Sequence, residues 1–433
     1  MFAKPLEMAS LSALPQELFL QVSKQLELGD QVRLSTTCKE YRTQLSPEIF
    51  KTIRFTNSEA LARSALAAVE AHGDYTSRIE FTCSANSDDE LTAPSLPLAA
   101  SKVLEGHFTP NLHTFRLRFD FDFTDGGEWD SRSSWGSIYL FEEFDDDAFV
   151  REEERRWKWR ALMKETWEAL AANNHVRELI LEDFIPKWTS TFGTDEFRQF
   201  LSRLESATFN IFGLDNGAGW KTNTQPGYTE FLASLDTSFF HHMSGLKHLH
   251  IQANNPLGLQ GRNYIPLALK PEDLPVLQSL KLEKCFVSPE LVSFIQGHTQ
   301  VLRSLDVKEC ASAGDGGGMS DNSIYWAEFF DGIYETKPSL TEFIAGGDRV
   351  LLTYDGMLDN ERVQDIRQKL KASLVLKLFS YGYLSDKYGT FHNNVEENVE
   401  QFINGDDQRA YDRLMGLIKK NAAQQGNEHG HTG

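Results

Sequence analysis

The chain has 433 residues, of which 40% are hydrophobic and 12% aromatic, so it can bury a sizeable core and is long enough for more than one domain. Its formal net charge of −20 argues against a nucleic-acid backbone or an anionic membrane surface as the main partner. No run of roughly eighteen apolar residues is present and the N-terminus lacks the apolar core of a secretory signal, so we expect no membrane segment.

The first part of the chain has the pattern of a small helical unit. Residues 1–12 are expected to be a flexible N-terminus, and the segment 13–55 follows with Pro15 at a helix start. Gly29 is expected to end the first helix and Asp30 to cap the second. Apolar residues at helical spacing form a face that this unit cannot fully bury alone: Leu18, Val22, Leu26, Leu34, Cys38, Tyr41 and Leu45.

The segment contains, in order, Leu14-Pro15-Gln16-Glu17, Asp30, Leu34, Cys38, Tyr41 and Pro47-Glu48-Ile49-Phe50. On these residues it closely resembles an F-box. The family implies docking on the small Skp-type adaptor of cullin-based SCF ubiquitin ligases, mostly through a Leu-Pro pair and the first two helices. An ordinary helical cap on a larger domain is the alternative interpretation. By this resemblance, the adaptor-binding residues are Leu14, Pro15, Leu18, Val22, Leu26 and Leu34.

A second pattern recurs further along the chain. Leu277-x-x-Leu280-x-Leu282-x-x-Cys285 is repeated as Leu302-x-x-Leu305-x-Val307-x-x-Cys310, with a helix opening at Ser288-Pro289 between the copies. This pattern and interval resemble a leucine-rich repeat with Cys at the ladder position. We therefore predict an α/β fold in which 56–348 form an irregular solenoid of strands and helices. Weaker copies begin at Leu112, Val176, Leu204, Leu246 and Leu340, the one at Leu246 placing Asn254 at the ladder position.

Insertions are expected at 120–147 and 253–271, where turn-forming or acidic residues interrupt the array. The acidic and aromatic part of the first insertion is either a surface loop or an element that contacts a substrate. The segment 349–420 is predicted to be a helical cap on the open end of the array, and 421–433 a disordered tail.

The sequence predicts no reacting group. It contains no GxxxxGK[ST], HExxH or GxSxG pattern, and the GDGGG run at 314–318 lacks the Lys-Ser/Thr of a phosphate loop. His241, His242, His248 and His250 have no Cys or carboxylate to complete a metal site, so we expect no metal and no cofactor. The four cysteines are too few and scattered for a disulfide framework, which favours reduced thiols in the cytoplasm or nucleus.

These features together predict a non-catalytic, two-part adaptor. Its N-terminal helices would bind a Skp-type subunit, and through it a cullin, while the repeat region presents a target protein for ubiquitination. One alternative is a Skp-bound scaffold that acts outside a ubiquitin ligase. A second alternative is an enzyme in the irregular C-terminal half, which would require a polar pocket with converging titratable residues.

Overall fold

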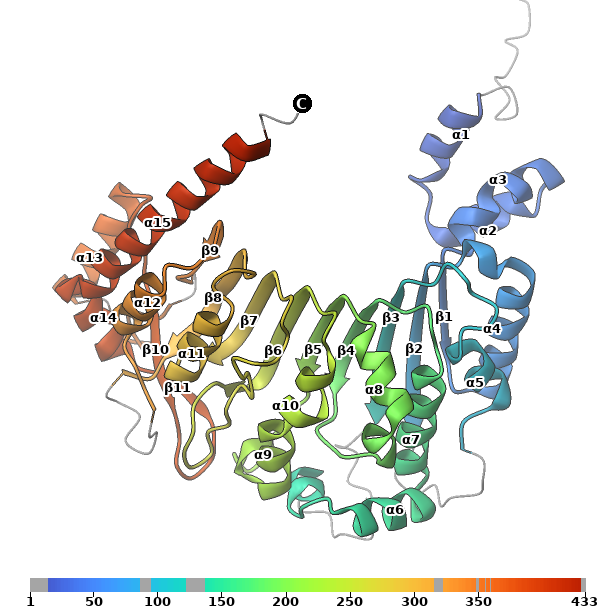
Figure 1. Cartoon of the computed structure of the whole chain (residues 1–433), viewed down its shortest axis with the longest axis horizontal. Coiled ribbons are helices and arrows are strands. Elements are labelled where there is room, and N and C mark those ends of the chain that lie inside the picture. The colour runs from blue at the N-terminus through green and yellow to red at the C-terminus, as the bar shows by residue number, and fades with distance from the viewer. Residues whose placement is uncertain are drawn as a thin grey trace, which may run out of the picture.

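The computed structural model is a mixed α/β protein with a sheet of eleven strands and fifteen α-helices in the part of the chain that it describes. Figure 1 shows the strands side by side in a curved row, with helices along one side and one group of helices at each end. The described residues are 15–85, 95–121, 137–314, 322–347, 350–354, 356–358 and 360–429.

Three short helices form an N-terminal helical module: α1 (Gln16–Ser23), α2 (Leu28–Ser35) and α3 (Lys39–Ile49). The prediction that Gly29 separates the first two helices is wrong, because α2 begins before it. The side chain of Gln31 closes the turn instead, donating from Nε2 to the carbonyls of Ser23 and Leu26 at 3.1 Å each. The module thus has three helices, as the sequence indicates, with the second starting earlier.

The strands that follow are parallel and pair in the order of the sequence. The pattern repeats in the backbone: the carbonyl of Lys51 accepts from the N–H groups of Ser77 and Arg78, and an equivalent pair joins each later strand to its neighbour, as far as β9. The strands are β1 (Thr52–Thr56), β2 (Arg78–Ala85), β3 (Thr114–Phe121), β4 (Glu178–Phe184), β5 (Ser206–Ile211), β6 (His248–Leu257), β7 (Ser279–Phe286), β8 (Ser304–Ser312) and β9 (Glu342–Ile344).

Equivalent apolar positions of the predicted repeats lie in one buried row across the sheet. Because side chains alternate between the two faces of a strand, these residues all point toward the helices. The row is continuous in the strand register from β1 to β9. It consists of Ile53, Ile79, Phe115, Leu179, Ala207, Leu249, Leu280, Leu305 and Phe343.

Helices cover this apolar face and complete one core that includes the fully buried Trp167. Each helix turns an apolar side toward the sheet, so neither layer can bury its surface without the other. The helices between the strands are α4 (Glu59–His72), α5 (Leu98–Leu104), α6 (Asp147–Arg156), α7 (Lys158–Ala171), α8 (Asp195–Ser202), α9 (Pro226–Ala233), α10 (Leu235–Ser238), α11 (Pro289–Gly297) and α12 (Trp326–Glu335).

The predicted ladder positions behave differently from strand to strand. In β7, Lys284 has a φ of 56° and the pairing shifts, so Cys285 turns inward and is buried. Cys310 is buried in the same way in β8, and its Sγ donates to the Leu282 carbonyl at 3.4 Å. Asn254 was expected to be equivalent, but β6 alternates regularly through Leu257 and leaves its side chain exposed. The ladder role predicted for Asn254 is therefore wrong.

The long connections leave from the carboxyl ends of the strands, and Figure 1 shows α6 and α9 along that edge. In the predicted insertion 120–147, residues 122–136 lie outside the described residues, and the rest includes the start of α6. The insertion predicted at 253–271 begins too early. Its first residues extend β6 to Leu257, because Ala253, Asn255 and Leu257 continue the buried alternation.

The segment 349–420 is not purely helical, contrary to the prediction. It contains α13 (Glu361–Ala372) and α14 (Val395–Asn404), but also β10 (Ser380–Leu384) and β11 (Phe391–Asn393). The two strands form an antiparallel hairpin, and β10 pairs in parallel with the end of β8. Tyr381 and Leu384 are buried there, and β10 pairs with β8, so this hairpin extends the sheet rather than merely covering its end.

The last helix, α15 (Asp406–His429), continues into the segment predicted as a disordered tail. The Nδ2 of Asn421 donates to the carbonyls of Pro338 and Leu340, at 2.8 and 2.9 Å. These contacts hold the helix against the loop before β9, which explains why it does not end at Lys420. Residues 430–433 lie outside the described part of the chain.

We expect the buried row to dominate stability. Leu280→Ala removes a fully buried side chain of this row and should lower the free energy of unfolding by about 2–5 kcal/mol in urea titrations, since it leaves a cavity. The matched control is Leu98→Ala in α5, whose side chain is 69% exposed; it should change stability by less than about 0.5 kcal/mol. Equal losses in both variants would contradict the shared-core interpretation.

Candidate functional site

The N-terminal helical module carries an exposed apolar surface. Leu18 and Val22 of α1 and Leu28 and Val32 of α2 are each between 42% and 47% exposed. The neighbouring Phe19 turns the other way and is buried. Aliphatic side chains grouped at this level of exposure mark interaction surfaces more often than ordinary protein surface. We name these four residues the apolar helix surface.

The structure places the six predicted adaptor-binding residues as follows. Pro15, Leu18 and Val22 are exposed, Leu26 and Leu34 are half-buried, and Leu14 lies outside the described residues. Sequence reasoning missed Leu28 and Val32. Their spacing of one helical turn would have revealed them had the start of α2 been placed correctly.

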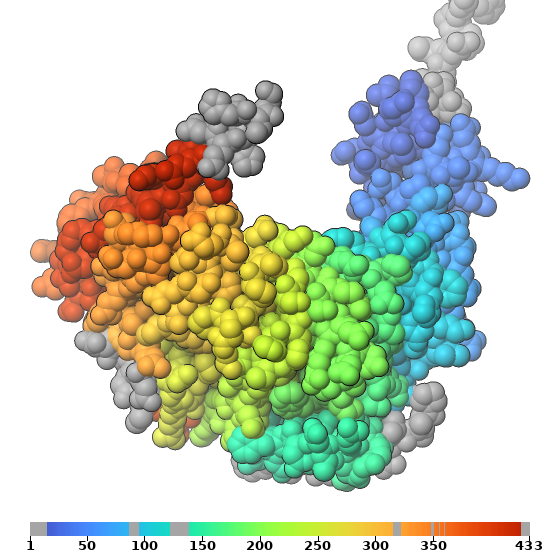
Figure 2. All heavy atoms as spheres, viewed as in Figure 1, coloured from blue at the N-terminus to red at the C-terminus, as the bar shows by residue number. Residues whose placement is uncertain are grey.

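The module contacts the rest of the protein at the end of α3. The ring of Phe50, directly after α3, stacks on His72 with centroids 4.0 Å apart, and its carbonyl accepts from Thr76 Oγ1 at 2.9 Å. Within the module, Phe19 stacks on Tyr41 at 4.8 Å. Figures 1 and 2 show α1 and α2 standing away from the sheet beyond β1. The apolar helix surface is therefore not covered by the strand array.

A second surface is the side of the sheet that faces away from the helices, which we name the open face. It is polar and rich in ion pairs near β1–β4. The carboxylate of Glu80 lies 2.6 Å from Nε of Arg54 and of Arg78, and Arg116 pairs with Glu182. The central row of this face is Arg54, Glu80, Arg116, Ile180, Thr208, His250, Lys281, Asp306 and Ile344.

These ion pairs shift the protonation of Glu80. Partial burial raises the pKa of its carboxyl, but the hydrogen bonds from Arg54 and Arg78 outweigh burial, and the net pKa lies below the usual value. Towards β7, Glu283 contacts Lys281 at 2.6 Å and His250 at 3.2 Å. Burial keeps the pKa of His250 low. The open face thus presents charges that are largely paired with one another.

The histidines do not gather into a metal site. His250 is engaged with Glu283, and His241 contacts Asp273 at 3.0 Å. Across the described ranges, no three His, Cys, Asp or Glu residues are arranged to hold a metal ion. Nor does any helix in those ranges have the length and apolar character needed to cross a membrane.

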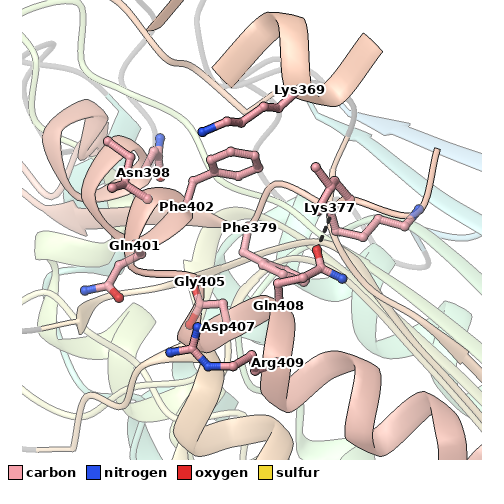
Figure 3. A pocket seen from close by; sticks show the side chains of 12 residues that line it. Lys369, Lys377, Phe379, Asn398, Gln401, Phe402, Gly405, Asp407, Gln408 and Arg409 are labelled. Atoms are coloured by element: carbon pink, nitrogen blue, oxygen red, sulfur yellow. Dashed lines mark hydrogen bonds between the residues drawn. The ribbon is translucent and has the colours of Figure 1, made fainter. Parts of the chain in front are cut away.

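A pocket of about 300 Å³ lies between α13, α14 and the start of α15 (Figure 3). Asp407 at its base is largely buried, and burial raises the pKa of its carboxyl to about 6. One carboxyl oxygen accepts from Tyr381 Oη at 2.8 Å, and the other from the Ala327 N–H at 2.9 Å. Both oxygens therefore anchor α15 to β10 and α12, which gives Asp407 a structural role.

Comparison with known proteins adds no identification: no family model and no curated protein matches this chain.

Glu80 should make stability depend on pH. Because its folded pKa is lowered, its contribution is present above pH 4.5, the ordinary value, and is lost as the pH falls through the folded pKa. Glu80→Gln should lower the free energy of unfolding by about 1 kcal/mol at pH 7, with a smaller difference near pH 3. Denaturant titrations at several pH values measure this. Glu70→Gln, an exposed site on α4, serves as the control, and a pH-independent effect of Glu80→Gln would contradict the assignment.

Proposed function

We propose that this chain is the substrate-recognition adaptor of an SCF-type cullin ubiquitin ligase. In this proposal α1–α3 are an F-box that binds a Skp-type subunit, and through it a cullin. The observation that carries it is the apolar helix surface, on a helical module held to the rest of the protein by one end. A cytoplasmic or nuclear location is part of the proposal, because all four cysteines are free thiols.

Energetics favour a partner on the apolar helix surface. Each of its four aliphatic side chains is a little under half exposed, so covering one would contribute on the order of 1 kcal/mol. A helical module that must bury its own apolar side would turn Leu18 and Val22 inward, as Phe19 does. Their exposure supports a second polypeptide as the covering surface.

We further propose that β1–β9 and their helices form an irregular leucine-rich-repeat-like solenoid that binds the target protein. The consecutive parallel order, the repeated carbonyl pairing and the single buried row support this. The side chains that point inward are buried in the core. We therefore assign target recognition to the open face and to the connections at the carboxyl ends of the strands.

The chain would supply no reacting group in this role. A ligase of this kind acts by holding an activated ubiquitin near a lysine of the captured target, so the adaptor contributes proximity and orientation. A Skp-bound scaffold outside a ligase would use the same apolar helix surface. The presence or absence of a cullin in the purified complex separates the two functions.

The apolar helix surface can be tested directly. Leu18→Asp with Val22→Asp places two charges where a partner would bury two aliphatic side chains, and should weaken binding to a Skp-type adaptor at least a hundredfold. Co-purification and surface plasmon resonance measure this, with the cullin subunit blotted in the same eluate.

The matched control is Leu98→Asp with Leu374→Asp, two exposed leucines outside the module. It carries the same change of charge and should bind the adaptor normally. Thermal melts of both variants should match the parent, because none of the four positions is buried. Retained adaptor binding by the first variant would overturn the proposed contact surface.

A further inference from the structure

The amino ends of the parallel strands form an edge whose residues are aligned by the repeated backbone pairing. Each carbonyl in this row accepts from two N–H groups at the start of the next strand, so the row crosses the sheet in register. Adjacent members are therefore one strand spacing apart, ~4.8 Å. We name it the amino-edge row. It consists of Lys51, Ser77, His113, Arg177, Glu205, Lys247, Gln278 and Arg303.

Positive charge collects on the part of this row between β4 and β8. Arg177, Lys247 and Arg303 belong to the row itself. Arg203 lies two residues before Glu205, in the turn that leads into β5. Glu205 is the single carboxylate of the row, and its Oε2 lies 2.7 Å from Nζ of Lys247. Because these two charges neutralise each other, the charge that remains belongs to the three arginines.

Backbone carbonyls hold the three arginines in place. Nη1 of Arg177 donates to two carbonyls of the turn before β4, at 3.0 and 2.9 Å. Nη2 of Arg203 donates to the Asn173 carbonyl at 3.0 Å. Nη1 of Arg303 donates to the Ser339 carbonyl, also at 3.0 Å. Among the described residues, these guanidinium groups pair with carbonyls and with no carboxylate, so they are fixed in position while their charges stay unneutralised.

Two further carboxylates lie at the first positions of the strands. Oε2 of Glu178 accepts from Oγ1 of Thr114 at 2.6 Å, and Oε2 of Glu342 accepts from Oγ of Ser304 at 2.8 Å. Because side chains alternate along a strand, these carboxylates point to the open face and away from the amino-edge row. They are therefore not the partners of the three arginines.

Arg177 and Arg203 are close enough to repel each other. Burial, and to a smaller extent the charge of Arg177, lower the pKa of the Arg203 guanidinium below its usual value. Within the described ranges, the buried Nε of Arg203 also has no hydrogen-bond partner. A negative charge beside both arginines would relieve the repulsion. This end of the charged part of the row is therefore suited to an anionic group.

The positive charge extends further than a single small anion can reach. Arg177 precedes β4 and Arg303 precedes β8, which are four strand spacings apart, or roughly 19 Å. An extended polypeptide covers that distance with about six residues, at ~3.3 Å each. Exposed charges more than ~8 Å away are largely screened at physiological ionic strength, so the net charge of −20 on the whole chain does not cancel the row.

The amino edge lies between two groups of helices. The N-terminal helical module joins β1 at one end of the edge, through Phe50, and α15 contacts the loop before β9 at the other end, through Asn421. Figures 1 and 2 show both groups projecting beyond the edge, on the side of the sheet opposite to α6 and α9. The three arginines are each only half-buried, so a segment that lies along the row can reach them.

We propose that the amino-edge row binds an extended acidic segment of a partner protein. Carboxylates at one end of the segment contact Arg177 and Arg203, and a carboxylate about six residues away contacts Arg303. A planar carboxylate matches the fork of a guanidinium group, which favours Asp or Glu side chains as the ligand. This surface includes neither the apolar helix surface nor the connections at the carboxyl ends of the strands. The inference therefore goes beyond the proposed function and does not depend on it.

The test uses the full chain and fluorescein-labelled dodecapeptides, with binding measured by fluorescence polarisation at about 0.15 M salt. The first peptide repeats Glu-Ser-Gly, the second has Gln in place of every Glu, and the third is the Gln peptide with one phosphoserine. The Glu peptide should bind at least tenfold tighter than the Gln peptide, and equal binding of the two would overturn the proposal. A phosphoserine peptide that binds as tightly as the Glu peptide would also overturn it, because a single anion would then suffice.

Substitutions in the row then locate the bound peptide. Arg177→Gln and Arg303→Gln should each weaken binding of the Glu peptide about tenfold, and together about a hundredfold, since one segment contacts both. Glu205→Gln removes the single carboxylate of the row and should tighten binding about threefold. The matched control is Arg262→Gln, at an exposed arginine in the connection after β6, and it should change nothing. Unchanged affinity in Arg303→Gln would refute the extended segment.

Lysine variants separate charge from structure. Arg177→Lys and Arg303→Lys keep the positive charge but lose the shape of the guanidinium group, so each should bind the Glu peptide within about threefold of the parent. Thermal melts of the lysine and glutamine variants show whether the fold is intact. If each lysine variant lost as much affinity as its glutamine counterpart, the arginines would act through structure and the proposed contact would be wrong.

Adaptor binding provides an independent measurement on the same variants. Arg177→Gln and Arg303→Gln should bind a Skp-type adaptor like the parent, and Leu18→Asp with Val22→Asp should bind the Glu peptide like the parent. Failure of the parent chain to bind any Skp-type adaptor would refute the proposed function and leave the peptide result valid. Loss of both activities in Arg177→Gln would contradict a separate acidic-segment site.

Discussion

The structure depends on a single constraint: no strand of the array can bury its inward side chains alone. Helices cover the row from Ile53 to Phe343, and along the row each residue lies beside its equivalents on the adjacent strands. Each unit is therefore stabilised by the next, and the two ends of the row must be closed by something else. The turn that follows α3 closes the first end, and the β10–β11 hairpin with α12–α15 closes the last.

This constraint separates the positions that stabilise the core from those left on the open face. Side chains that point to the helices are committed to the core, so they tolerate little change in size. Those on the open face form ion pairs with one another, such as that of Glu80 with Arg54. The N-terminal helical module keeps the apolar helix surface apart from both the core and the open face. In the proposed function, the adaptor and the target protein therefore bind at separate surfaces of the chain.

The errors of the sequence analysis share a physical origin. Asn254 has the spacing of the ladder position. Whether a strand bulges there depends on how it pairs with its neighbour, which the spacing does not encode. The β10–β11 hairpin was missed because its pairing with β8 joins residues far apart in the chain. The start of α2 was misplaced because Gln31 closes the preceding turn with its side chain, an option that propensity does not reveal.

The sequence by itself determined the periodic features: the helical spacing of Leu18 and Val22, and the alternating apolar residues whose copies fall in one register row. These follow from the geometry of single helices and strands, which is local. Only the tertiary structure decided that β8 is shared between β9 and β10, and that the β10–β11 hairpin extends the sheet. Those features arise from contacts between segments distant in sequence, where packing and strand pairing override local preference.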